Sequence, residues 1–249
     1  MGLNSYLNYI KSRKVGIQGM KCLIIIPAYN EAENIERVVE TLHRDYPQYD
    51  YVVVNDGSKD DTAKICRQKG YNLVDLKVNT GLAGAFQTGM KYAHYKDYDY
   101  AIQYDGDGQH NPAYIADMIQ KMEQEQMDIV IGSRFVTKKK PLSARMIGNT
   151  LIEGCILLTT RKKIKDPTSG MRLFNKRMIA KLAKSMNYGP EPDTIAYLIN
   201  CGAKVSEIQV EMNERIAGES YLNFSRTIKY MTTICSSILL LQWFRKREL

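Results

Sequence analysis

Long hydrophobic runs and paired cysteines are both missing from this sequence. The longest uncharged apolar run, from Tyr230 to Phe244, has fifteen residues, whereas a membrane-spanning helix needs about 20. Residues 1–19 lack the apolar core of a secretory signal peptide and carry several basic side chains. The five cysteines are odd in number and widely spaced, so we expect reduced thiols in the cytosol rather than a disulfide or zinc framework.

Two common nucleotide-binding fingerprints are absent as well. Gly81, Gly84 and Gly89 are not spaced like the Gly-x-Gly-x-x-Gly of a dinucleotide fold. Met90 stands where a P-loop requires lysine. These absences argue against an NAD-dependent enzyme and against a P-loop ATPase.

Acidic residues are scarcer than basic ones. The chain has 35 Lys and Arg against 27 Asp and Glu, which leaves a formal net charge of +8 at pH 7. This surplus favours anionic partners, among them nucleic acid, acidic lipid headgroups and phosphorylated substrates. Because no nucleic-acid recognition motif is present, we expect no nucleic acid partner.

Apolar segments alternate with helical patterns through the first half of the chain. We expect strands at 22–26, 51–54, 72–77 and 100–104, separated by helices that begin near Glu33, after an N-cap at Ser58, and at Gly81. This alternation predicts an α/β fold, a mostly parallel sheet with helices on both faces.

The chain has 249 residues, and its second half alternates less regularly between strand and helix patterns. We expect a strand at 129–131, a helix at 143–160, an extended segment at 169–175, helices at 176–186 and 193–201, and a strand at 204–211. The economical division is a lead-in at 1–19, one large domain at 20–222 and a C-terminal amphipathic helical extension at 223–249.

Two carboxylates stand one residue apart in Asp105-Gly106-Asp107, directly after the fourth expected strand. One interpretation is a turn, because Asp-Gly is a common turn signal. The other is a binding site for Mg²⁺ or Mn²⁺, because paired carboxylates offer hard oxygen ligands and glycine lets the backbone turn tightly.

The surroundings of this pair favour the metal interpretation. Polar sequences follow each of the four strands, at 27–31, 55–61, 79–84 and 105–110. Ligands of open parallel sheets bind beyond the carboxyl ends of the strands. We therefore expect these four segments to meet at one crevice.

Six motifs occur along the chain in a fixed order. They are Pro27-Ala28-Tyr29-Asn30-Glu31, Asn55-Asp56-Gly57-Ser58-Lys59-Asp60-Asp61-Thr62, Asn79-Thr80-Gly81-Leu82-Ala83-Gly84-Ala85, Asp105-Gly106-Asp107-Gly108-Gln109, Ser169-Gly170-Met171-Arg172 and Arg215-Ile216-Ala217-Gly218-Glu219-Ser220. Together they resemble glycosyltransferase family 2, whose members have the Rossmann-like GT-A fold. Within that family the chain is most similar to the polyprenyl-phosphate sugar synthases, over about residues 20–225.

The resemblance implies roles for individual residues. The implied substrate-binding residues are Pro27, Tyr29, Glu31, Asp56, Gly81, Gly84, Asp105, Arg134, Arg145, Arg172 and Ser220. The implied metal ligands, for Mg²⁺ or Mn²⁺, are Asp105, Asp107 and Gln109. In this scheme Asp56 accepts a hydrogen bond from the base, and Arg134, Arg145 and Arg215 hold phosphates. Asn55 stands where many relatives have a second Asp.

Transfer to a hydroxyl acceptor with inversion needs a general base, and two carboxylates are candidates. Glu191 and Asp193 lie in Gly189-Pro190-Glu191-Pro192-Asp193, where the prolines favour a fixed turn. Asp166 is a further possibility. If the acceptor is an ionised phosphate, no base is required. The expected catalytic set is Asp105, Asp107, Glu191, Asp193 and Arg215.

The resemblance implies an inverting transfer from a UDP-, GDP- or dTDP-sugar to a lipid-linked acceptor. That acceptor would be polyprenyl phosphate or a lipid-linked glycan in cell-surface or cell wall polysaccharide synthesis. Two alternatives are a nucleotidyltransferase that makes a sugar nucleotide, which would share a nucleotide fold and a carboxylate pair, and a non-catalytic module that binds an anionic partner.

An apolar stripe marks the C-terminal segment. Phe224, Ile228, Met231, Cys235, Ile238 and Leu241 lie at helical spacing. The helix could pack on the domain, form a homodimer or bind a membrane protein. We favour an interfacial helix, with Trp243 at headgroup depth and the basic tail on acidic lipid, which predicts a cytoplasmic protein peripheral to the inner face of the cell membrane.

Overall fold

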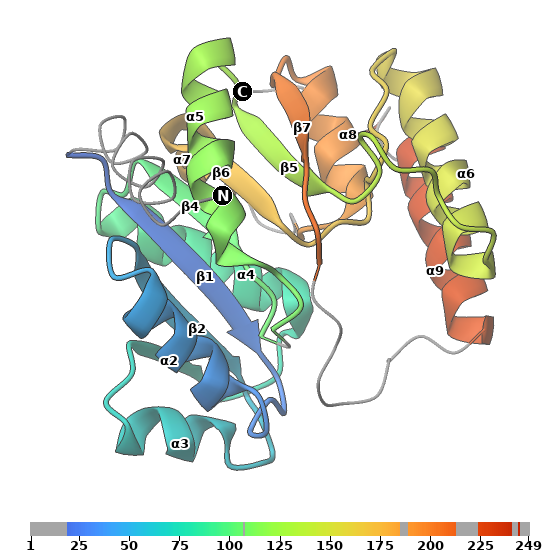
Figure 1. The fold of residues 1–249 in the computed structure, drawn as a ribbon. Coiled ribbons are helices and arrows are strands. Elements are labelled where there is room, and N and C mark those ends of the chain that lie inside the picture. The colour runs from blue at the N-terminus through green and yellow to red at the C-terminus, as the bar shows by residue number, and fades with distance from the viewer. Residues whose placement is uncertain (1–18, 107, 185–188, 213–223, 241–243, 245–249) are drawn as a thin grey trace, which may run out of the picture.

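A seven-stranded sheet organises the chain in the computed structural model, which describes residues 19–106, 108–184, 189–212, 224–240 and 244 (Figure 1). The strands are β1 (Cys22–Ala28), β2 (Asp50–Asp56), β3 (Leu73–Leu76), β4 (Tyr100–Gln103), β5 (Ile129–Ser133), β6 (Arg172–Asn175) and β7 (Val205–Gln209). The helices are α2 (Ile35–Asp45), α3 (Thr62–Gln68), α4 (Gly81–Tyr95), α5 (Ile115–Glu125), α6 (Ala144–Thr160), α7 (Lys176–Lys184), α8 (Pro192–Asn200) and α9 (Phe224–Leu239), with a 3-10 turn at Pro112–Tyr114.

The strands lie in the order β3-β2-β1-β4-β6-β5-β7. β1 pairs in parallel with β2 and β4, as do β2 with β3 and β5 with β7. β6 alone runs antiparallel, between β4 and β5. The prediction of an α/β fold with a mostly parallel sheet is therefore confirmed.

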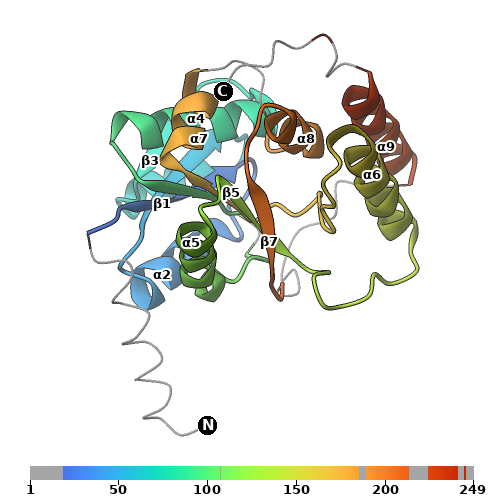
Figure 2. The same cartoon turned by 90° about the horizontal axis from the view of Figure 1, so that it is seen from above.

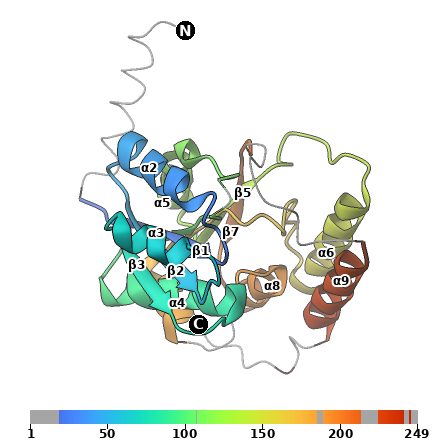
Figure 3. The ribbon, with the colours of Figure 1, turned by 90° about the horizontal axis from the view of Figure 1, so that it is seen from below.

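Apolar side chains cover both faces of this sheet, because the central strands are buried on both sides. In β1, Ile24 and Ile26 face the cluster formed with α2 and α5, whereas Leu23 and Ile25 face the cluster formed with α4 and α7. Figures 2 and 3 show α2 and α5 on one side of the sheet and α4, α7 and α8 on the other.

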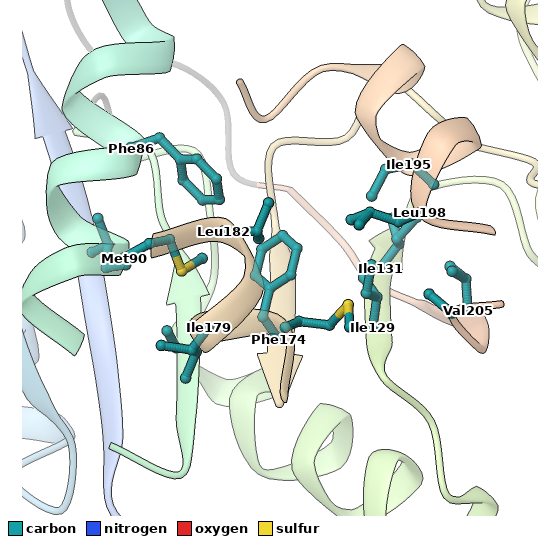
Figure 4. Packing of buried hydrophobic residues seen from close by; sticks show 14 of the residues in the cluster. Phe86, Met90, Ile129, Ile131, Phe174, Ile179, Leu182, Ile195, Leu198 and Val205 are labelled. Carbon is teal, nitrogen blue, oxygen red and sulfur yellow. The ribbon is translucent and has the colours of Figure 1, made fainter. Parts of the chain in front are cut away.

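One of these cores extends from the first half of the chain to the last strand. Figure 4 shows Phe86 and Met90 of α4 lying near Phe174 of β6, with β5, α8 and Val205 of β7 continuing the layer. The rings of Phe86 and Phe174 are 5.6 Å apart. The continuous packing holds the late strands β5, β6 and β7 in register with the early ones.

The expected N-cap at Ser58 is wrong. α3 begins at Thr62, with Asp61 at the N-cap position. Residues 58–61 instead form a loop, because Ser58 Oγ accepts a hydrogen bond from the Asn30 backbone N–H at 3.0 Å and Asp60 accepts one from Ala32 N–H at 3.1 Å.

The described part of α9 packs on the protein through its apolar stripe. Ile234 and Ile238 are buried in the same core as α4 and α8, and Met231 and Cys235 are half-buried. Lys229, Thr232, Thr233 and Ser236 are exposed and make this helix's outer face polar. Within the described residues, no helix is both long enough and apolar enough to cross a bilayer.

Candidate active site

The predicted site segments meet at one edge of the sheet. β1 is parallel to β2 and to β4. β4 and β5 each run antiparallel to β6, which lies between them, so they are parallel to each other. The carboxyl ends of these four strands therefore lie on the same side of the sheet. Because β6 runs the other way, its first residue, Arg172, lies at this edge too and pairs with Gln103 of β4. The loop before β6 therefore joins the crevice expected from the sequence.

His110 holds the chain that carries Asp105. Its Nδ1 accepts a hydrogen bond from the Asp105 backbone N–H at 3.0 Å, which places the ring proton on Nε2. That nitrogen lies 3.4 Å from Asp105 Oδ2. Tyr104 fixes the other side of the turn, since its hydroxyl donates to the His110 carbonyl at 2.6 Å. His110 is buried, so it positions the loop.

The Asp105 carboxylate lies against the loop before β6, and the following residue, Gly106, lies against the end of β1. A Cβ at Gly106 would be 3.3 Å from the Pro27 carbonyl oxygen, and a Cβ at Gly170 would be 2.5 Å from Asp105 Oδ2. Glycine at position 170 therefore lets the loop before β6 approach the Asp105 carboxylate this closely, whereas a Cβ at Gly106 would make only a tight contact. The Asp105 side chain keeps 39% of its surface exposed, which leaves its oxygens accessible to a ligand.

Replacing Gly170 by Ala should lower activity by displacing this carboxylate. The added methyl group would overlap Asp105 Oδ2, and small displacements at a reacting centre cost roughly 100-fold in rate. Steady-state turnover of Gly170→Ala measures the effect. Gly154→Ala is the control, because a Cβ at Gly154 meets no atom within 4 Å. Equal activity of both variants would contradict this placement.

The residues present suit a hard divalent cation. The Asp105 carboxylate and the half-exposed Gln109 amide at this turn offer the oxygen ligands that Mg²⁺ and Mn²⁺ prefer. Nearby, Gln103 Oε1 is buried without a hydrogen-bond partner among the described residues. Those residues contain no cluster of three or more His, Cys, Asp or Glu side chains suited to a metal, and the second predicted ligand, Asp107, lies outside them.

Buried Arg172 organises the loop beside Asp105. Its guanidinium donates to the carbonyl oxygens of Ser169 at 2.9 Å, Pro167 at 2.7 Å and Glu191 at 3.3 Å. Burial lowers the pKa of Arg172, while the nearby carboxylates of Glu191 and Asp105 act to raise it. The observed contacts of Arg172 are thus with the backbone, and its substrate contact stays a prediction.

Asp56 connects two of the strand-end loops. The buried carboxylate at the end of β2 accepts hydrogen bonds from the backbone N–H and the hydroxyl of Thr80, both at 2.7 Å. Thr80 in turn packs against Gly84 in the first turn of α4, which Gly81 opens. The structure therefore gives Asp56 a fixed position, and its contact with a base stays a prediction.

The loop that follows β1 is tied to the loop that follows β2. Asn30 has a left-handed backbone, φ 56°, and its side-chain oxygen accepts from Lys59 N–H at 2.8 Å. Glu31 N–H donates to Thr62 Oγ1 at 2.9 Å. Pro27 and Tyr29 are half-buried beside this junction. The predicted nucleoside-binding residues thus lie on or beside two loops, those that follow β1 and β2, which hydrogen bonds hold together.

Arg134 pairs with a buried carboxylate. Its Nε and Nη2 donate to the two oxygens of Asp166 at 2.7 and 2.8 Å, and Asn149 Nδ2 donates to Asp166 at 3.0 Å. Burial acts to raise the pKa of Asp166, but the Arg134 contacts outweigh it and hold the pKa below its ordinary value. Asp166 is fully buried, so this position does not suit a general base. The phosphate role of Arg134 stays a prediction.

The two other candidate bases contact α9. Glu191 is the N-cap residue of α8 but makes no side-chain capping hydrogen bond, and its carboxylate accepts from the Tyr230 hydroxyl at 2.5 Å. Asp193 accepts from Ser237 Oγ at 2.7 Å. Burial and the adjacent Glu191 raise the pKa of Tyr230, so this phenol remains the donor. Glu191 is linked to the Asp105 region through Arg172.

Several predicted residues cannot be placed. Arg215, Ser220 and Asp107 lie outside the described residues, as does the side chain of Arg145, whose backbone belongs to the first turn of α6. Their predicted roles in phosphate, substrate and metal binding stay predictions.

The structure also identifies positioning residues that sequence reasoning missed. Thr80, Asn30 and Tyr230 each hold a predicted site residue or its loop by a hydrogen bond. Thr80 and Asn30 lie inside the motifs, where they could have been noticed. Tyr230 follows Glu191 by 39 residues, and no local pattern connects the two.

Comparison with known proteins agrees with this arrangement. The family described as Glycosyl transferase family 2 matches residues 23–183. UDP-N-acetylglucosamine–dolichyl-phosphate N-acetylglucosaminyltransferase of Methanococcus voltae is 34% identical over 185 residues, which cover 66% of this chain and 72% of that protein. Undecaprenyl-phosphate mannosyltransferase of Micrococcus luteus is 27% identical over 219 residues, 82% of this chain and 88% of that protein.

A solved structure gives the same fold. Glucosyl-3-phosphoglycerate synthase from Mycobacterium tuberculosis, in complex with Mn²⁺, uridine diphosphate and phosphoglyceric acid, superposes with a TM-score of 0.66 at 15% identity, covering 92% of this chain and 82% of that one. This likeness confirms the predicted GT-A fold. Since the family match spans more than half of its length, the chain belongs to glycosyltransferase family 2 and is a glycosyltransferase.

Proposed function

We propose that this glycosyltransferase transfers a sugar, with inversion, from a nucleoside-diphosphate sugar to a lipid-linked acceptor at a membrane surface. The acceptor is polyprenyl phosphate or a lipid-linked glycan. The observation that carries the proposal is the position of Asp105, whose accessible carboxylate lies against the loop before β6 while the next residue, Gly106, lies against the end of β1. The names of the relatives, which act on dolichyl and undecaprenyl phosphates, support the choice of acceptor.

The nucleoside and the diphosphate of the donor bind at two different places along the carboxyl ends of the strands. The loops that follow β1 and β2, with Tyr29 and Asp56, hold the nucleoside. Asp105 and Gln109, with Asp107 as the third predicted ligand, would hold Mg²⁺ or Mn²⁺, a choice supported by the structural neighbour solved with Mn²⁺ and uridine diphosphate. When bound, the cation supplies electrostatic stabilisation of the charge that develops on the departing diphosphate.

Glu191 orients or deprotonates the acceptor. Glu191 directly precedes Pro192 at the start of α8, and its backbone carbonyl accepts a hydrogen bond from Arg172, the first residue of β6. A hydroxyl acceptor would give its proton to this carboxylate as the new glycosidic bond forms. A phosphate acceptor is already ionised, and Glu191 then only orients it.

Tyr230 should act as a positioning residue for Glu191. Tyr230→Phe removes the hydroxyl that donates to Glu191 at 2.5 Å, and hydrogen bonds to a charged group contribute about 1.5–3 kcal/mol, so kcat should fall roughly 10-fold or more. The KM for the donor should stay unchanged. Tyr95→Phe is the control, since Tyr95 is 83% exposed. An unchanged kcat with lowered thermal stability would show a purely structural contact.

The proposal can be tested in two steps. Thermal shifts with UDP-, GDP- and dTDP-sugars, with and without Mn²⁺, identify the donor, and radiolabelled transfer to polyprenyl phosphate identifies the acceptor. We expect one donor to raise the Tm only with the cation, and label to enter the organic phase. Pyrophosphate release from a nucleoside triphosphate would instead indicate nucleotidyl transfer.

A further inference from the structure

Among the described side chains of α6, those that face outward are uncharged. Ile147, Leu151 and Leu158 are 58%, 56% and 75% exposed, and they repeat along one side of the helix. Leu157, 44% exposed, widens the same side. The positions between them, Thr150 and Gly154, are exposed and uncharged. We call these six residues the α6 outer face.

A helix at the surface of a soluble domain normally turns one apolar side inward and a charged side outward. α6 already buries its inward side, because Ile152 and Ile156 belong to the core shared with α4 and α8. Figures 1 and 2 show α9 beside α6 at one end of the molecule. The α6 outer face is therefore additional apolar surface, and large exposed apolar surface marks an interaction site.

Exposed cations border the α6 outer face. Arg161, Lys162 and Lys163 follow the last turn of α6 and are exposed, and Lys163 lies 3.6 Å from Glu153. At the other end, Leu142 is fully exposed, shortly after the exposed Lys138 and Lys139, of which Lys138 pairs with Glu211. Apolar side chains flanked by basic ones match the boundary between acyl chains and anionic headgroups in a bilayer.

We propose that the α6 outer face docks this protein on an anionic lipid bilayer. This inference rests on the proposed lipid-linked acceptor for its choice of partner. It adds α6 to the membrane contact predicted for the C-terminal segment, whose Trp243 and basic tail lie outside the described residues. The charge bordering the face selects anionic lipid.

A second copy of the chain fits this face less well than a bilayer. A helix of 17 residues is about 25 Å long, and one side of it, roughly 10 Å wide, offers about 250 Å². A stable protein interface buries about 800 Å² on each partner. A bilayer needs no such minimum, because insertion of a few apolar side chains adds to electrostatic attraction.

The docking helix is connected to the active-site edge. Asn149 projects from the inward side of α6 and donates to Asp166 at 3.0 Å and to Thr168 at 2.8 Å. Asp166 holds Arg134 at the end of β5. A bilayer under α6 would thus lie beside the edge at which the proposed lipid-linked acceptor must arrive.

Vesicle sedimentation tests the docking surface. The probe is phosphatidylcholine vesicles with and without phosphatidylglycerol, and the variant is Leu151→Glu/Leu158→Glu. We expect the wild type to sediment with the anionic vesicles, less so at high salt, and the variant to partition at least ~10-fold more weakly. Thr233→Glu/Ser236→Glu, on the exposed polar side of α9, makes the same charge change and should bind as the wild type does.

A second variant separates apolar insertion from charge and from misfolding. Leu151→Ser/Leu158→Ser leaves the charge unchanged and should also bind weakly. Wild-type protein that ignores anionic vesicles, variants that bind as the wild type does, or a wild-type dimer that these changes turn into a monomer would each overturn the proposal.

Donor thermal shifts on the same proteins keep the two proposals distinguishable. All variants should retain the donor shift of the wild type. If no nucleotide sugar binds the wild type, the proposed function fails, whereas the vesicle result still decides the docking surface.

Discussion

Asp105→Asn should lower sugar transfer by roughly 100- to 1,000-fold, the loss expected when one group that stabilises developing charge is removed. The substitution keeps the size of the side chain and removes its negative charge, which a divalent cation requires. The fold should survive, because the carboxylate is 39% exposed and the local turn depends on the backbone N–H of Asp105 and on His110.

The measurement is kcat over a Mn²⁺ series, together with the Tm of each protein. Asp45→Asn is the matched control, since Asp45 is an exposed carboxylate at the end of α2, paired only with neighbouring Arg44 among the described ion pairs. The control should keep its activity. Turnover of Asp105→Asn at the wild-type rate would remove Asp105 from the catalytic set.

Of the substitutions proposed here, Asp166→Asn should lower the free energy of unfolding most, by about 3–5 kcal/mol, which is the usual effect of breaking a buried ion pair. Asp166 has no exposed surface and accepts from the Arg134 backbone, the Arg134 guanidinium and Asn149. Removing its charge leaves the guanidinium without its partner. Glu211→Gln is the control, because the Glu211–Lys138 pair is exposed and should contribute nothing measurable.

The same pair gives a pH dependence with a definite sign. The folded-state pKa of Asp166 is lowered, so its contribution is complete above the unfolded pKa, about 3.9, and is lost as the pH falls further through the folded pKa. Denaturant unfolding should therefore show a constant gap between wild type and Asp166→Asn from pH 7 to about 4, which narrows below about 4. A gap that widens in acid would contradict this assignment.

Much of the fold could be predicted from the sequence because its signals are local. The apolar run at Cys22–Ala28 and the helical spacing in α2 identify their own structures. The polar strand ends then place Asp56 and Asp105 at one edge by the geometry of parallel sheets. The direction of β6 could not be predicted, since four residues with an extended pattern carry no information about strand direction.

The features that could not be predicted from the sequence are contacts between segments far apart in the chain. Arg134 and Asp166 are 32 residues apart, and basic residues near a motif do not reveal which carboxylate holds them. The C-terminal stripe had two interpretations, packing on protein and binding to a membrane. Apolar spacing shows that one face of a helix is buried, but it does not show whether protein or lipid covers that face. α9 covers its described stripe with the protein, whereas α6 leaves an apolar face exposed.

In the function we propose, Asp105 anchors a cation-dependent site that binds a nucleotide sugar, and the sugar is transferred to a lipid-linked acceptor. The most direct test is radiolabelled transfer from the donor found by thermal shift to polyprenyl phosphate in detergent, with Mn²⁺ and with EDTA. We expect a labelled lipid product with Mn²⁺, none with EDTA, and almost none from Asp105→Asn. Undiminished transfer in EDTA, or no lipid-linked product from any donor that binds, would contradict it.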